Sequence, residues 1–156
     1  MTNLVRNRMK KILNILLCGL SLLAIEYFFL LFSMQTERIL KYDIPITKFS
    51  GALGGAGEIS LVRFIFYFVP WVIAVYLIYD KLNIKRPVLK LALVNCGLYI
   101  LLSVVMTLFF PFAKEYFERA FFYYLILATF ISPFVLGMIP YFNRIIRFLI
   151  SPAGVD

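Results

Sequence analysis

The stretch ILNILLCGLSLLAIEYFFLLF, residues 12–32, decides the fold of this chain. A helix needs about 20 apolar residues to cross roughly 30 Å of hydrocarbon, and this run has that length. Glu26 lies inside the run, with apolar neighbours on both sides and no Lys or Arg among them. Because a carboxylate facing acyl chains is costly, Glu26 predicts that one face of this helix packs against protein or lines a hydrated interior.

The composition of the whole chain points to the same class of protein. Of its 156 residues, 63% are hydrophobic and 15% are charged, and the mean hydropathy is +0.92. Soluble domains carry about a quarter charged residues, so this chain has too few to cover a water-facing surface. The apolar residues fall in four long runs, which predict an all-α integral membrane protein with transmembrane helices at about residues 12–32, 61–79, 88–110 and 120–139. Pro70 and Pro133 predict kinks in the second and fourth helices.

The distribution of Lys and Arg predicts the orientation. The N-terminal tail, the second connection and the C-terminal tail together hold ten Lys or Arg residues against two acids. The other two connections, taken with Arg63, hold six against five. Lys and Arg accumulate on the cytoplasmic side, so we expect four spans with both termini in the cytoplasm, in a bacterial inner membrane.

Basic residues beside the predicted spans suit membrane lipids. The C-terminal segment 141–150 alternates apolar residues with Arg144 and Arg147, a pattern typical of a short helix lying in the membrane interface. Lys85 and Arg86 occupy the short second connection. We expect these four cations to face anionic headgroups, which accounts for the net charge of +8 without a nucleic-acid partner.

The first connection, residues 34–60, is the longest polar one and ends in a glycine-rich segment. A phosphate-binding loop of the Walker type needs Lys and then Ser or Thr after its last glycine, and Glu58 and Ile59 stand there instead. Two interpretations are left for the glycine-rich segment. It is a mobile linker, or it is a re-entrant segment in which glycines let backbones approach closely.

Three roles are open for Glu26. It pairs with Arg63 or Arg119 to hold the helices together, it pairs with a polar group on another subunit, or it relays a proton or binds a cation. A second polar feature is the stripe Asn95, Tyr99, Ser103 and Thr107, spaced by four along the third predicted helix. Such a stripe serves as hydrogen-bonding contact between helices or lines a hydrated path.

The residues needed for catalysis are not grouped in a recognisable pattern. The chain has no histidine, and its two cysteines, Cys18 and Cys96, form no Cys-x-x-Cys pair. We therefore expect no cofactor, no metal site and no enzymatic activity. The preferred hypothesis is a non-enzymatic subunit of a larger inner-membrane complex, with other membrane subunits and lipids as partners. The alternative is a channel-like or transporter-like homo-oligomer with a path lined by Glu26 and the stripe from Asn95 to Thr107.

Overall fold

The computed structural model describes residues 3–43, 45, 48–109 and 121–149. These residues form helices joined by short connections and contain no strand. In chain order the elements are α1 (Asn3–Tyr42), α2 (Ser50–Arg63), the π-helical turn η1 (Phe64–Phe68), α3 (Val69–Ile78), the short 3-10 turn η2 (Tyr79–Lys81), α4 (Pro87–Phe109), α6 (Phe121–Met138) and α7 (Pro140–Phe148).

Several of these helices have the length and apolar composition of membrane spans. Within the described residues, three helical segments qualify: Val5–Tyr42, Ser50–Lys81 and Pro87–Phe109. A fourth is added if Tyr123–Met138 and Pro140–Phe148 are taken as one broken span. The all-helical prediction is thus confirmed, and the helices are consistent with a multi-pass membrane protein.

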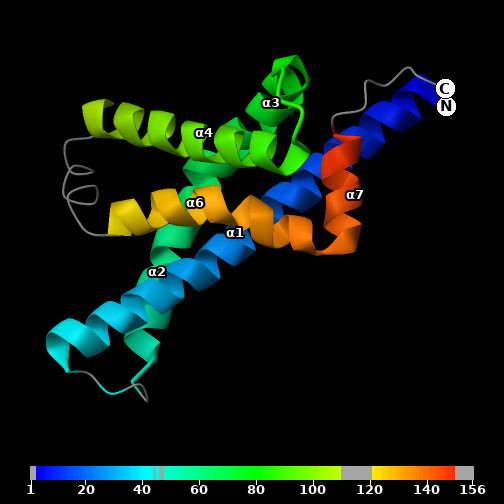
Figure 1. The fold of residues 1–156 in the computed structure, drawn as a ribbon. Coiled ribbons are helices and arrows are strands. Elements are labelled where there is room, and N and C mark those ends of the chain that lie inside the picture. The colour runs from blue at the N-terminus through cyan, green and yellow to red at the C-terminus, as the bar shows by residue number, and fades with distance from the viewer. Residues whose placement is uncertain (1–2, 44, 46–47, 110–120, 150–156) are drawn as a thin grey trace.

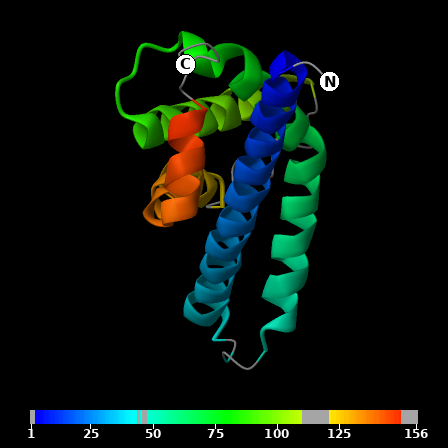
Figure 2. The ribbon, with the colours of Figure 1, turned by 90° about the vertical axis from the view of Figure 1, so that its right-hand side faces the viewer.

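The first layer of the fold is a long antiparallel hairpin, in which α1 runs beside α2, η1 and α3 (Figure 2). At about 1.5 Å per residue, α1 is roughly 60 Å long, twice the thickness of the hydrocarbon core. It ends at Tyr42 because Asp43 adopts a left-handed backbone conformation, with φ at 50°, and Pro45 follows.

The prediction of a mobile linker at the glycine-rich segment is wrong, because α1 continues to Tyr42 and α2 already begins at Ser50. The close packing expected in the alternative interpretation is present, in the form of a continuous helix that contacts α1. Small residues of this segment pack against α1, although an added Cβ atom at Gly54 or Gly57 would have no atom within 4 Å. Ala52 and Ala56 are fully buried, and a Cβ atom on Gly55 would lie 2.6 Å from the Met34 side chain. Close packing against α1 therefore outweighs the low helix propensity of glycine.

The register between the two arms of the hairpin changes once. Met34 faces Gly55 and Glu26 contacts Arg63, so eight residues along α1 correspond to eight along α2. Beyond that point, Gly19 faces Trp71, so seven residues of α1 correspond to eight on the other arm. The π-helical turn lies between Arg63 and Trp71 and accommodates the extra residue. Pro70, which has no N–H to donate, is the second residue after this turn.

The second layer consists of α4 and α6, which pack side by side and cross the hairpin (Figure 1). Trp71, Leu22, Leu91 and Leu136 are among the side chains buried between the layers. At Ile139 the backbone becomes extended before Pro140, so the chain turns and the axes of α6 and α7 differ by 109°. Helix α7 then folds back against α4 and the first half of α1.

Candidate functional site

The candidate site is a buried polar network centred on Glu26, at the place where the two layers cross. Glu26 is 0% exposed, and its Oε2 atom accepts a hydrogen bond of 2.6 Å from Nη2 of Arg63 on α2. Arg63 is itself only 7% exposed, so the ion pair is enclosed by protein. Of the partners considered for Glu26, the structure places Arg63 beside it. Arg119 lies outside the described residues.

The second oxygen of Glu26 is held by the other layer. Its Oε1 atom accepts hydrogen bonds of 2.8 Å from Asn95 Nδ2 on α4 and of 2.8 Å from Ser132 Oγ on α6. Asn95 Nδ2 also donates to the carbonyl oxygen of Thr129, again at 2.8 Å. A single carboxylate therefore joins α1, α2, α4 and α6.

Two tyrosines complete the surroundings of the ion pair. The Tyr67 hydroxyl lies 2.6 Å from Asn95 Oδ1 and 2.8 Å from the Asn95 carbonyl oxygen, and it donates to these acceptors. The Arg63 guanidinium carbon lies 5.4 Å from the centre of the Tyr67 ring and 5.0 Å from that of Tyr99. Both distances are within the range of a cation–π interaction, so the cation is stabilised by aromatic faces as well as by the carboxylate.

The hydrogen bonds to the Glu26 carboxylate limit the chemistry that this network can perform. Three donors from three helices engage both carboxylate oxygens of Glu26 and fill three of about four acceptor positions. A buried ion pair gains stability only when further hydrogen bonds compensate for desolvation, and Asn95 and Ser132 supply them. The Arg63 Nε atom has no hydrogen-bond partner among the described residues. The arrangement is therefore suited to holding helices together.

The polar stripe of α4 is directed into the molecule, but its members differ in what they contact. Asn95, Tyr99 and Ser103 are buried, and Thr107 is partly buried. The Ser103 and Thr107 hydroxyls donate to the carbonyl oxygens of Tyr99 and Ser103, each four residues earlier in the same helix. Their donors are thus used within α4, whereas Asn95 bonds across helices through its side-chain amide.

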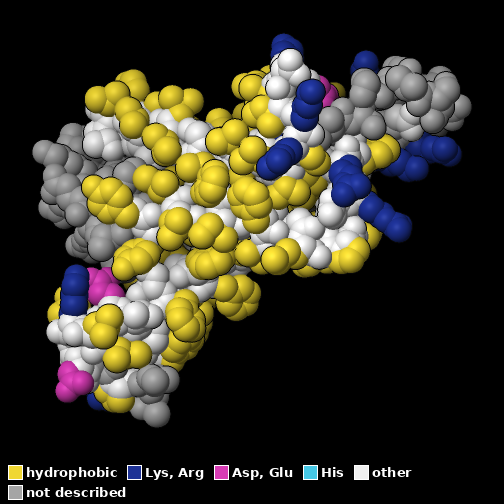
Figure 3. Space-filling model, in the orientation of Figure 1, with side chains coloured by type: hydrophobic (Ala, Val, Ile, Leu, Met, Phe, Trp, Pro, Cys, Tyr) yellow, Lys and Arg dark blue, Asp and Glu magenta, His cyan; other side chains and the backbone are white. Residues whose placement is uncertain are grey.

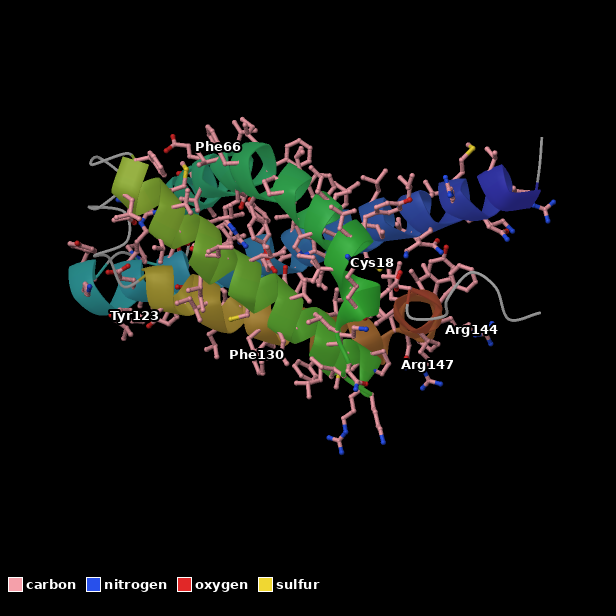
Figure 4. The ribbon with its side chains drawn as sticks, turned by 90° about the horizontal axis from the view of Figure 1, so that it is seen from above. Cys18, Phe66, Tyr123, Phe130, Arg144 and Arg147 are labelled. Atoms are coloured by element: carbon pink, nitrogen blue, oxygen red, sulfur yellow. The ribbon has the colours of Figure 1, made fainter. Side chains whose placement is uncertain are left out.

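The four cations expected at lipid headgroups are exposed: Lys85, Arg86, Arg144 and Arg147. On α7, Ile145 and Ile146 are buried while Arg144 and Arg147 point away from the molecule (Figure 4). Arg147 Nε donates to Asn143 Oδ1 at 3.1 Å. The N-terminal half of α1 lies at the end of the fold where these four cations are found. There Lys11 pairs with Asp80.

Three members of the network were not identified as site residues from the sequence: Tyr67, Thr129 and Ser132. Tyr67 stands four residues after Arg63, a spacing that places both on one helix face, and this signal was available. Ser132 is a polar residue within an apolar run, next to Pro133, and this signal was available as well. Thr129 takes part through its backbone carbonyl, which no residue pattern reveals.

The remaining polar and sulfur groups do not form a metal site in the part of the chain that the structure describes. No group of three or more His, Cys, Asp or Glu side chains gathers there in a way that could hold an ion. Cys18 is buried and Cys96 is partly buried, and both are free thiols. Figure 4 shows Cys18 on the inner side of α1.

Comparison with protein-family models, with curated proteins and with solved structures finds no match to this chain.

Proposed function

We propose that this chain is a non-enzymatic subunit of a larger inner-membrane assembly, in which the Glu26 network holds four helices in one arrangement. The observation that carries the proposal is the engagement of both Glu26 carboxylate oxygens by Arg63, Asn95 and Ser132 of the same chain. Intramembrane ionisable groups mark an ion path or a ligand site when they face a cavity or a partner. Here both oxygens are used internally, which favours a structural role for the charge.

The outward surface supports a role in assembly. Large apolar side chains are exposed on every long helix, among them Phe32, Phe66, Leu101 and Tyr123. Figure 4 shows Phe66, Tyr123 and Phe130 on the outer sides of their helices. Lipid covers such residues in part, and neighbouring subunits cover them in a complex. In the proposed orientation, the basic end with Lys11, Lys85 and Arg144 faces the cytoplasm.

The channel-like alternative receives less support from the geometry. A path through a homo-oligomer requires its polar lining to face the interface between copies. Asn95, Tyr99 and Ser103 instead face the chain's own neighbouring helices. No observation on the described residues favours this alternative over the subunit proposal.

The test is the composition and mass of the assembly in its native membrane. The tagged protein is extracted at its natural expression level with a mild detergent, and light scattering and mass spectrometry give its mass and partners. We expect a heteromeric complex with fixed stoichiometry. The Glu26→Ala variant should lose it, whereas the Thr107→Ala variant should keep it. A closed ring of identical copies supports the alternative instead, and a lone monomer contradicts both.

A further inference from the structure

A groove of about 740 Å³ runs along α1 on the side away from α2. It lies where the tip of the hairpin diverges from α6, so α1 forms one wall and α6 the other (Figure 1). Toward Ile25 the walls of the groove are apolar. They include Phe28, Phe29 and Phe32 of α1 with Val135 of α6. Figure 3 shows hydrophobic side chains on both sides of this divergence.

One end of the groove is polar and carries a pair of opposite charges. Glu37 and Lys41 line it, and Lys41 Nζ donates to Glu37 Oε1 at 2.5 Å. The Lys41 ammonium group keeps two further N–H donors, and Glu37 keeps its second oxygen as an acceptor. These residues follow the apolar run of α1, so this end lies at the membrane surface and the phenylalanines lie in the hydrocarbon.

The groove has the length and volume of a site for an acyl chain. From Ile25 to Lys41 it extends along α1 for about 24 Å, at about 1.5 Å per residue. The volume falls within the roughly 300–1,000 Å³ of small-molecule sites.

The charge pair decides the class of headgroup. A purely anionic headgroup at Lys41 would also meet the carboxylate of Glu37, and a purely cationic one would meet the ammonium of Lys41. A zwitterion satisfies both, with phosphate oxygens toward Lys41 and an ammonium group toward Glu37. We propose that the groove between α1 and α6 binds one acyl chain of a zwitterionic phospholipid whose headgroup is held by Glu37 and Lys41. This inference is independent of the proposed subunit function.

A cross-linking experiment in nanodiscs tests the proposal. The discs contain equal amounts of a zwitterionic phosphoethanolamine lipid and an anionic phosphoglycerol lipid. A photoreactive benzoyl-phenylalanine replaces either Phe28, in the groove, or Leu61, which stands opposite it in the hairpin register on α2. The two positions are matched in exposure, 66% and 61%, and in depth. Mass spectrometry then identifies the lipid attached at each.

We expect at least a five-fold enrichment of the zwitterionic lipid at position 28 relative to position 61. In the Glu37→Gln/Lys41→Gln background the enrichment should disappear. The Lys41 side chain is 59% exposed and that of Glu37 20%, and an i,i+4 pair near the surface contributes little to stability, so the double variant should still fold. Equal lipid composition at both positions overturns the proposal. Cross-linking of position 28 to a protein overturns it as well, and it would identify the groove as a subunit contact.

Discussion

Glu26 and Arg63 are separated by 37 positions in the chain, and they meet as an ion pair of 2.6 Å in which the two side chains are 1% and 8% exposed. The pair joins the two arms of the hairpin, while Asn95 and Ser132 attach the second layer to the same carboxylate. Contacts that join two layers are sensitive to single substitutions, because removal of one partner leaves others buried without a bond.

The Glu26→Ala substitution should destabilise the fold strongly. It leaves the buried Arg63 cation without its counter-charge, and breaking a buried pair in this way costs about 3–5 kcal/mol. The free energy of unfolding in mixed micelles, measured by titration with a denaturing detergent, gives the change. A loss below about 1 kcal/mol would show that Arg63 has another anion or reaches water.

The Glu26→Gln/Arg63→Gln double variant should lose less stability than the sum of the two single variants. Both charges are removed together, and Gln at position 26 still offers an acceptor to Asn95 and Ser132. We expect a coupling energy of about 0.5–3 kcal/mol, the range for residues in one network. Strict additivity in this double-mutant cycle would contradict a direct interaction.

The Asn95→Leu substitution should cost about 1–3 kcal/mol, because Tyr67, Glu26 and the Thr129 carbonyl each lose a buried partner. Thr107→Ala is the control on the same helix face. Its hydroxyl donates to the Ser103 carbonyl oxygen within its own helix, so we expect less than about 0.5 kcal/mol. Equal losses in thermal unfolding experiments would refute the assignment of Asn95 as a residue that hydrogen-bonds α4 to its neighbours.

The Gly19→Ala substitution should destabilise the contact between α1 and α3. A Cβ atom there would lie 2.7 Å from Trp71 Cζ3 and 2.8 Å from Phe68 Cε2, so the rings must shift at a cost of about 1–3 kcal/mol. Gly97→Ala is the control, since a Cβ atom at that position would have no other atom within 4 Å. The control should be neutral or gain up to about 1 kcal/mol from helix propensity. Thermal unfolding of both variants distinguishes these outcomes.

The proposed orientation of the chain predicts which introduced surface cysteines a membrane-impermeant maleimide labels. Lys85 and Lys48 are both exposed, and they lie at opposite ends of the helices. In intact cells, we expect labelling of the Lys48→Cys variant and none of the Lys85→Cys variant until the membrane is permeabilised. The reverse pattern would place the termini outside the cell.

The sequence was informative about the helices and less so about how they contact one another. Hydropathy alone places helices over 88–110 and 120–139, close to α4 (Pro87–Phe109) and α6 (Phe121–Met138). It failed at the glycine-rich segment, because burial of Ala52 and Ala56 in the contact of α2 with α1 overrides the weak helix propensity of the glycines.

The candidate site was foreseeable only in part. A carboxylate in an apolar run demands a polar partner, and Arg63 was one of two cations considered. Convergence of Asn95, Ser132 and Tyr67 on that carboxylate depends on the register and crossing of four helices. Such information lies in tertiary packing, which local residue patterns do not encode.

The π-helical turn at Phe64–Phe68 has a consequence for the gene as well as for the fold. Because this turn holds one residue more than an α-helix needs, removal of a single codon for Ile65 or Phe66, both of which are exposed, should restore regular winding. Arg63 and Trp71 would still face Glu26 and Gly19. The same in-frame deletion at exposed Leu101 would rotate the two ends of α4 by about 100° relative to each other. Such a variant should not fold. The turn is thus a position at which natural variation in chain length can be absorbed within a membrane span.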